Sequence, residues 1–136
     1  MKKSIFANLV PQKQHERFLN KKIGIQSSVF EQQICQILKQ FSSDYRGNIL
    51  SCFQLSNNGF YMMPSTAEQT IKIFIRDNDY EGCLSTGAAG VVASLFAINA
   101  FSKKIPNNTK LIPCYYALED FAYEHPEASA IFEAID

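Results

Sequence analysis

The residues best suited to chemistry in this sequence are two histidines, one of which has acidic neighbours. His125 follows Glu124 and comes shortly after Asp120, whereas His15 stands near the start of the chain. A histidine beside a carboxylate can activate a serine or cysteine nucleophile. The sequence has no Gly-x-Ser-x-Gly motif, however, and its two histidines lack the spacing of metal ligands. We therefore expect no catalytic residues, no cofactor and no metal, and we expect His125, which precedes Pro126, to mark a helix end.

Two further patterns resemble ligand-binding loops. Residues 77–82 have acids at the first, third and fifth positions and glycine at the sixth, as in the first half of a calcium loop. The twelfth position, which would supply a bidentate carboxylate, is Ala88, so an acidic turn between strands is the better interpretation. Gly82, Gly87 and Gly90 are not followed by Lys-Ser or Lys-Thr, which excludes a P-loop. We expect Gly87 and Gly90 to let a helix pack closely on a sheet or another helix, with an anion at that helix N-terminus as the alternative.

The four cysteines are too far apart to form a zinc motif. Cys35, Cys52, Cys83 and Cys114 are separated by 17, 31 and 31 positions. Each lies in an apolar stretch, which is typical of reduced cysteines in a core. No apolar run approaches the ~18 residues of a membrane span, and the short apolar segment 5–10 ends at Pro11. We expect four reduced, buried thiols, with disulfides as the alternative, in a cytoplasmic protein without a membrane segment.

Composition excludes several classes of function. The 136 residues are 46% hydrophobic and 19% charged, which is typical of one folded domain over residues 1–136. Thirteen Lys and Arg balance thirteen Asp and Glu, which argues against a strongly basic nucleic-acid binder and against an acidic mimic of DNA. Aromatic residues such as Tyr61 and Phe74 could stack on bases, but Lys72 and Arg76 are the only basic residues between positions 48 and 103. We therefore expect these aromatic residues in the core.

Charge is nonetheless unevenly distributed along the chain. Residues 1–48 carry eight Lys or Arg against three acids, whereas residues 49–136 carry five against ten. The last 18 residues contain six acids and no Lys or Arg. Solvated helix faces explain such a run, and an acidic patch that meets a basic partner surface is the alternative.

Hydrophobic periodicity and turn residues predict an α+β fold. We expect helices over about 11–23, 27–42, 85–102, 111–125 and 126–135, and strands over 48–55, 60–63, 71–76 and 80–84. Asn58 and Gly59 supply the positive φ angles of a tight turn, which predicts a hairpin from the first two strands. Ser27 or Ser28 should cap the second helix, and Ser85 or Thr86 the third. We predict a small antiparallel sheet of three to four strands in a meander, packed with four to five helices at the N- and C-terminal ends.

Three stretches of the sequence form a distinctive pattern, namely residues 55–64 (LSNNGFYMMP), residues 80–99 (from YEG to FAIN) and residues 116–136 (from YAL to AID). Together they resemble the ArdB/KlcA-type antirestriction proteins of plasmids and other mobile elements. Residues 44–47 and 18–24 are also similar to the family pattern. In order and spacing, the resemblance covers nearly the whole chain.

The sequence departs from this family pattern at five positions. Asn48 and Asn58 stand where the family usually has glycine, and Leu50 stands where it has tryptophan. Gly87 replaces an aspartate and Tyr116 replaces a histidine. Each replacement suits the same local structure, so the expected fold is unchanged.

The resemblance implies an inhibitor without catalytic activity that relieves type I restriction–modification and protects incoming DNA. Its partner would be a type I restriction–modification enzyme or an associated host protein. Because the net charge is neutral, we expect protein contacts or an indirect effect, and not DNA mimicry. The candidate contact residues are the hairpin tip (Asn57 and Asn58) and the acidic C-terminal segment (Glu119, Asp120, Glu124 and Asp136). Two alternatives are a nucleic-acid-binding accessory protein of a mobile element and an enzyme with a pocket around His125.

Overall fold

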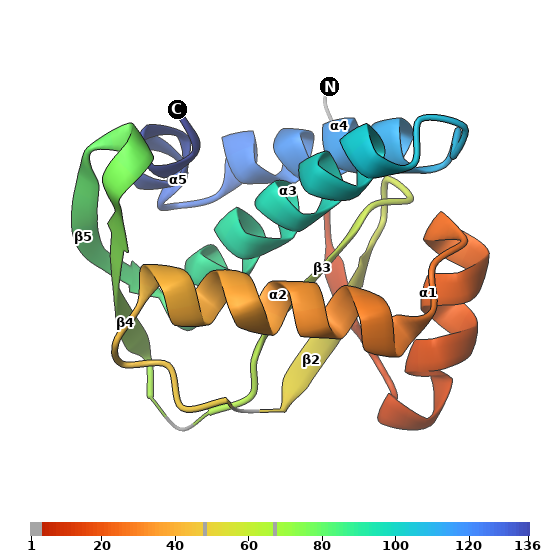
Figure 1. The fold of residues 1–136 in the computed structure, drawn as a ribbon, viewed down its shortest axis with the longest axis horizontal. Coiled ribbons are helices and arrows are strands. Elements are labelled where there is room, and N and C mark those ends of the chain that lie inside the picture. Colours follow the sequence, from red (N-terminus) through yellow and green to blue (C-terminus); the bar gives the residue numbers. More distant parts are fainter. Residues whose placement is uncertain (1–3, 48, 67) are drawn as a thin grey trace.

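The structure, a computed structural model, describes residues 4–47, 49–66 and 68–136 (Figure 1). Within these residues the chain forms, in order, β1 (Ala7–Val10), the 3-10 turn η1 (Gln12–Gln14), α1 (His15–Ile23), α2 (Ser27–Phe41), β2 (Leu50–Leu55), β3 (Phe60–Pro64), β4 (Thr70–Ile75), the 3-10 turn η2 (Arg76–Asn78), β5 (Tyr80–Ser85), α3 (Thr86–Lys104), α4 (Leu111–Glu124) and α5 (Ala128–Ile135). The predicted α+β class is confirmed.

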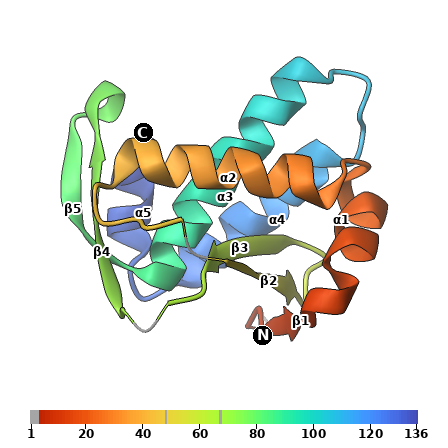
Figure 2. The same ribbon diagram turned by 60° about the horizontal axis from the view of Figure 1, so that its bottom comes forward.

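The strands form two antiparallel sheets. β1, β2 and β3 pair in this order, so that Cys52 of β2 lies between Val10 and Met62. β4 and β5 form a second, two-stranded sheet at the opposite end of the molecule from α1 (Figure 2). β1 is not predicted from the sequence, because Asn8 interrupts its short apolar run and Pro11 ends it.

The strands are divided between two sheets because α3 covers the edge of β3 that does not pair with β2. The buried Ser94 hydroxyl accepts a hydrogen bond from the Met62 backbone N–H (3.0 Å) and donates one to the Met62 carbonyl oxygen (3.3 Å). One turn earlier, a Cβ on Gly90 would lie 2.4 Å from the same carbonyl oxygen. A further strand cannot pair at an edge that a helix occupies, so β4 joins a separate sheet. The expected close packing is therefore confirmed at Gly90.

Helix α3 is the centre of the fold. It packs against α2, α4, α5, β3, β4 and β5, and most of its residues are buried. The predicted cap is confirmed, because the Ser85 hydroxyl accepts a hydrogen bond from the Ala88 N–H (3.0 Å). Burial is not confined to one face and includes Ala93 and Ala97, since other elements surround the helix on several sides. Neither α3 nor any other described helix is long and apolar enough to cross a membrane.

Turns and caps differ locally from the predictions. α2 begins at Ser27, preceded by Gln26 without a side-chain cap, so the predicted serine cap is wrong. The β2–β3 hairpin is confirmed, but the positive φ angle is found at Asn58 (73°) and not at Gly59. Gly59 is needed for space, because a Cβ there would lie 2.9 Å from the Cβ of Ala117 on α4. Asn48, where the first expected strand begins, lies outside the described residues.

An aromatic stack positions α4 against the three-stranded sheet. Tyr61 of β3 stacks on Phe53 of β2, with ring centroids 5.2 Å apart. Tyr61 also stacks on Phe121 of α4 at 5.5 Å. α5 packs against α3, α4 and β5, so the last two helices adjoin at the surface (Figure 1).

Candidate functional site

The tip of the β2–β3 hairpin, which carries Asn57 and Asn58, is docked against α4. The Asn57 Nδ2 donates to the carbonyl oxygen of Ala117 (2.8 Å), and its Oδ1 accepts from the Gly59 N–H (3.1 Å). Asn58 is exposed, and its carbonyl oxygen accepts a hydrogen bond from the Lys22 Nζ (3.0 Å). The half-buried Asn57 thus links the hairpin to α4, and Asn58 is the tip residue with the more accessible surface.

The four acidic candidates do not form one cluster but lie at different places along α4 and at the end of α5. Glu119 and Asp136 line the same groove between these helices. Asp120 is exposed on α4. Glu124, at the end of α4, accepts a hydrogen bond from the Ile5 N–H (2.9 Å) and so holds the N-terminal segment. The structure therefore brings Glu119 and Asp136 together, whereas Glu124 has a structural role of its own.

This groove is lined by aromatic side chains. They are not among the candidate residues predicted from the sequence. The groove has a volume of about 560 Å³, and its lining includes Tyr115, Glu119, Tyr123, Phe132, Ile135 and Asp136. The rings of Tyr123 and Phe132 stack with centroids 4.4 Å apart, although Tyr123 is 65% exposed. The four-residue spacing of Tyr115, Glu119 and Tyr123 is the sequence signal that would have placed them on one helix face.

Among the described residues, the acidic side chains of the groove have no ion-pair partner. Across the part of the chain that the structure describes, the close contacts of basic side chains with acids are those of the two histidines with glutamates, and no lysine or arginine pairs with an acid. Burial raises the pKa of Tyr115, and the charges of Glu119, Tyr116 and Asp136 raise it further. The groove therefore has a negative potential.

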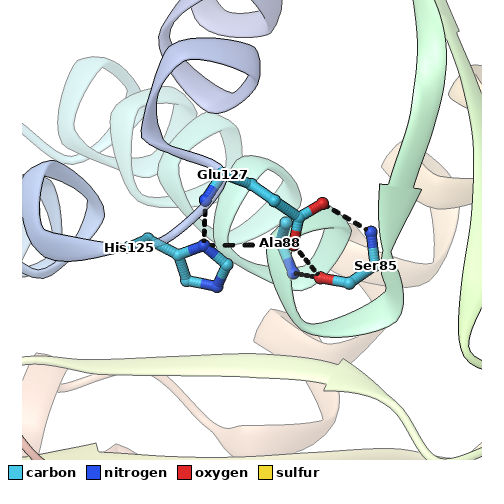
Figure 3. A network of polar contacts seen from close by, with 4 residues as sticks. All are labelled: Ser85, Ala88, His125 and Glu127. Atoms are coloured by element: carbon cyan, nitrogen blue, oxygen red, sulfur yellow. Dashed lines mark hydrogen bonds and ion pairs between the residues drawn. The ribbon is translucent and has the colours of Figure 1, made fainter.

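Glu127, just before α5, holds a polar network at the N-terminus of α3 (Figure 3). Its carboxylate accepts hydrogen bonds from the Ser85 backbone N–H (2.9 Å) and from the Ser85 hydroxyl. The same hydroxyl accepts from the Ala88 N–H, which faces out of the first turn. The helix dipole favours a negative charge at this end. A carboxylate of the chain itself thus takes the place that the sequence analysis considers for a bound anion.

The same network defines the role of His125. Its Nδ1 accepts a hydrogen bond from the Glu127 N–H (3.0 Å), which places the proton of the neutral ring on Nε2. The Ser85 hydroxyl donates to Glu127 and not to the histidine, so the three residues lack the order of a catalytic triad. His125 follows the last residue of α4, as predicted, and its ring nitrogen accepts a hydrogen bond there.

His15 and residues 77–82, which are considered above as metal ligands, have structural roles instead. His15 is buried, and its Nε2 donates to the Val10 carbonyl oxygen (3.1 Å) while its Nδ1 lies 3.5 Å from the Glu31 carboxylate. Residues 77–82 form the turn between β4 and β5 and the start of β5, with Asp79 at a φ of 51°. The part of the chain that the structure describes contains no group of three His, Cys, Asp or Glu side chains able to hold a metal ion.

The four cysteines are free, as predicted, but they are not all buried. Cys52 and Cys114 are buried, Cys35 is half-buried and Cys83 is exposed. Burial, followed by the charge of Glu31, raises the pKa of Cys52 to about 12. Cys83 points to the outer face of the β4–β5 sheet, which it shares with Phe74 (50% exposed). The prediction of a core position is therefore wrong for Cys83 and for Phe74.

Comparison with known proteins shows the family. A family model described as antirestriction protein matches residues 43–136. The chain belongs to the antirestriction protein family. Two antirestriction proteins KlcA from Escherichia coli are relatives, one 39% identical over 102 residues (73% of this chain, 71% of that protein) and one 41% identical over 95 residues (68% and 64%). The uncharacterized protein YfjX of Escherichia coli K12 is 31% identical over 130 residues, which cover 93% of this chain and 85% of that protein.

A solved structure is similar to this antirestriction protein along its whole length. It comes from work on the KlcA and ArdB proteins, which describes a novel fold and antirestriction activity against type I DNA restriction systems in vivo but not in vitro. The TM-score is 0.87 at 34% identity, and the match covers 100% of this chain and 98% of the other. The ArdB/KlcA resemblance and the fold it implies are confirmed.

Three of the residues at which this antirestriction protein departs from the expected family pattern fit their surroundings. Leu50 is buried in β2 opposite Pro64. Gly87 lies in the first turn of α3, where a Cβ would make contacts of 3.9 Å or more. Tyr116 is 59% exposed on α4. These three residues are therefore accommodated without a steric conflict, and Asn48 lies outside the described residues.

Proposed function

We propose that this antirestriction protein relieves restriction by type I restriction–modification systems in the cytoplasm and so protects the incoming DNA of a plasmid or other mobile element. The observation that supports this most strongly is the full-length similarity to the KlcA/ArdB structure, whose proteins act against type I systems in vivo. The family model, described as antirestriction protein, supports an antirestriction role, and it matches residues 43–136.

We infer that the protein acts by binding and not by catalysis. The most triad-like group, Ser85 with Glu127 and His125, has its hydrogen bonds in an order that does not activate the serine. Its partner is a type I restriction–modification enzyme or an associated host protein. Since the related proteins act in vivo but not in vitro, we expect the effect to need a cell component that a purified reaction lacks.

The charge distribution supports protein contacts and not DNA mimicry. A mimic of DNA would need dense rows of carboxylates spaced like phosphates. Here thirteen acids are balanced by thirteen bases, and the acids of the α4–α5 groove lie among aromatic side chains. We keep Asn58, Asp120 and the acids of the groove as contact residues, and we assign Asn57 and Glu124 the additional task of holding the hairpin tip and the N-terminal segment.

The experiment that tests this function measures the plating efficiency of unmodified phage on cells with an active type I system, with and without this protein. We expect a rise of several orders of magnitude, with the modification activity of the cells unchanged. No rise in cells that contain the folded protein would contradict the proposal. In that case salt-dependent binding of the purified protein to duplex or single-stranded DNA would favour the nucleic-acid-binding alternative.

A further inference from the structure

The groove between α4 and α5, defined above by its lining, combines aromatic and aliphatic side chains with two acids. Tyr115 and Tyr123 contribute from α4, and Phe132 and Ile135 contribute from α5. Its volume of about 560 Å³ is large enough for several side chains of a bound segment. The stacked rings of Tyr123 and Phe132 give one of its walls a firm aromatic surface.

The apolar surface continues from the groove along the outward side of α4. Tyr116 is 59% exposed and Ile112 is 56% exposed, and Tyr123 farther along is 65% exposed. Positions 112, 116 and 123 follow helical spacing, so these side chains form a stripe on one side of the helix. Scattered apolar residues are normal at a surface, whereas several exposed apolar side chains on one side of a helix beside a groove are typical of an interaction site.

The charge beside this stripe indicates which partner fits. Glu119 and Asp136 line the groove, and residues 111–136 contain no lysine or arginine. Within the described residues no lysine or arginine forms an ion pair with either acid. The phosphates of a nucleic acid would be repelled here, while cationic side chains would be attracted. Arginine fits both the acids and the aromatic rings of the groove, because its guanidinium pairs with carboxylates and stacks on aromatic rings.

We propose that the α4–α5 groove binds a basic segment of a partner protein, whose arginine or lysine side chains pair with Glu119 and Asp136 and stack on Tyr123. This proposal rests on the proposed function, because it names the surface by which the antirestriction protein contacts its target or an associated host protein. The aliphatic residues of such a segment would lie on the exposed stripe of α4. Binding therefore has an electrostatic part, which salt weakens, and an apolar part, which salt does not weaken.

Purified protein and a fluorescein-labelled synthetic peptide of arginine and leucine test the groove directly. Fluorescence anisotropy should show that the double substitution Glu119→Lys and Asp136→Lys raises the Kd by about tenfold or more, with a smaller salt dependence. The matched control is Glu81→Lys with Glu133→Lys, which makes the same change in net charge at exposed positions outside the groove. The control should bind like the wild type. An equal loss in both double variants would mean a general charge effect and would overturn the proposal.

Two substitutions of Tyr123 test the aromatic wall of the groove. Tyr123→Ala should raise the Kd several-fold, whereas Tyr123→Phe, which keeps the ring beside Phe132, should bind like the wild type. Circular dichroism should show that both variants are folded, since Tyr123 is exposed. Unchanged peptide binding in Tyr123→Ala would contradict the stacking role. If the wild type dimerises and the groove variants are monomeric by analytical ultracentrifugation, the groove is an interface with a second copy and the proposal is wrong.

Phage plating separates a failure of this inference from a failure of the proposed function. If the function is right and the inference is right, the wild type and the Glu81/Glu133 control relieve restriction, and the Glu119/Asp136 double variant does not. If the wild type relieves restriction and the Glu119/Asp136 double variant does so equally, the groove is not the contact surface. If the wild type itself gives no relief, the proposed function fails, whatever the peptide measurement shows.

Discussion

Alanine substitution at two glycines of the same helix should have opposite effects on stability. Gly87 and Gly90 are one turn apart on α3. A Cβ at position 90 would meet the Met62 carbonyl oxygen at 2.4 Å and the Cβ of Met63 at 2.5 Å, whereas a Cβ at position 87 would make contacts of 3.9 Å or more. Alanine is otherwise preferred over glycine inside a helix by up to about 1 kcal/mol. The two variants therefore differ mainly in the space that the fold leaves for one methyl group.

The magnitude for Gly90→Ala follows from the contacts that must open. To restore an ordinary contact of about 3.4 Å, α3 and β3 must separate by roughly 1 Å. That shift would stretch both hydrogen bonds between Ser94 and Met62, which are 3.0 and 3.3 Å long, and leave a buried N–H without a good partner. Overpacking together with the weakened bonds costs about 3–4 kcal/mol, of which the gain in helix propensity offsets about 1. We expect a net loss of about 2–3 kcal/mol.

Urea denaturation and thermal unfolding of both variants measure this difference. Gly90→Ala should lower Tm by roughly 10 °C, and Gly87→Ala should leave it unchanged or raise it slightly. Equal stability of Gly90→Ala and the wild type would refute the close approach of α3 to β3. A loss in Gly87→Ala as large as that in Gly90→Ala would show that helix flexibility, and not space, is the reason for glycine at both positions.

Three further predictions concern the core and the thiols. Ser94→Ala should cost about 1–3 kcal/mol in urea denaturation, because the buried Met62 N–H loses its partner; a loss below about 0.5 kcal/mol would contradict that role. Stability should fall as pH rises above about 9, since the Cys52 thiol ionises near 9.0 in the unfolded chain but has a pKa of about 12 when folded. In Cys52→Ala this decline should be smaller, and an identical pH profile would refute the assignment. Cys83 should react with a thiol reagent in the native protein well before Cys52 and Cys114, and simultaneous labelling would count against their burial.

Local pattern was sufficient to predict most elements of this fold. The apolar spacing in α2 and the β-branched alternation in β4 arise from contacts that each element makes along one side, and this periodicity is visible in the sequence. Likewise Ser85 caps α3 through a hydrogen bond to a residue three positions away. Such short-range features depend on neighbouring residues, so sequence reasoning finds them.

The features that the sequence does not predict depend on packing between distant parts of the chain. The strands divide into two sheets because Gly90 and Ser94 let α3 cover the edge of β3, a contact between residues about 30 positions apart. The docking of Asn57 on Ala117 spans 60 positions. The groove arises because α5 returns beside α4 and brings Phe132 next to Tyr123. The sequence therefore predicts the acids of the candidate site from their charge. It does not predict that aromatic side chains lie beside them in the groove.

The most direct test of the central claim measures relief of restriction against the amount of this protein in the cell. Unmodified phage would be plated on two otherwise identical hosts, with and without a type I system, while expression of the chain is raised stepwise. We predict that plating efficiency rises with the protein level on the restricting host and stays constant on the other. A constant, low plating efficiency on the restricting host at every level of folded protein would contradict the account.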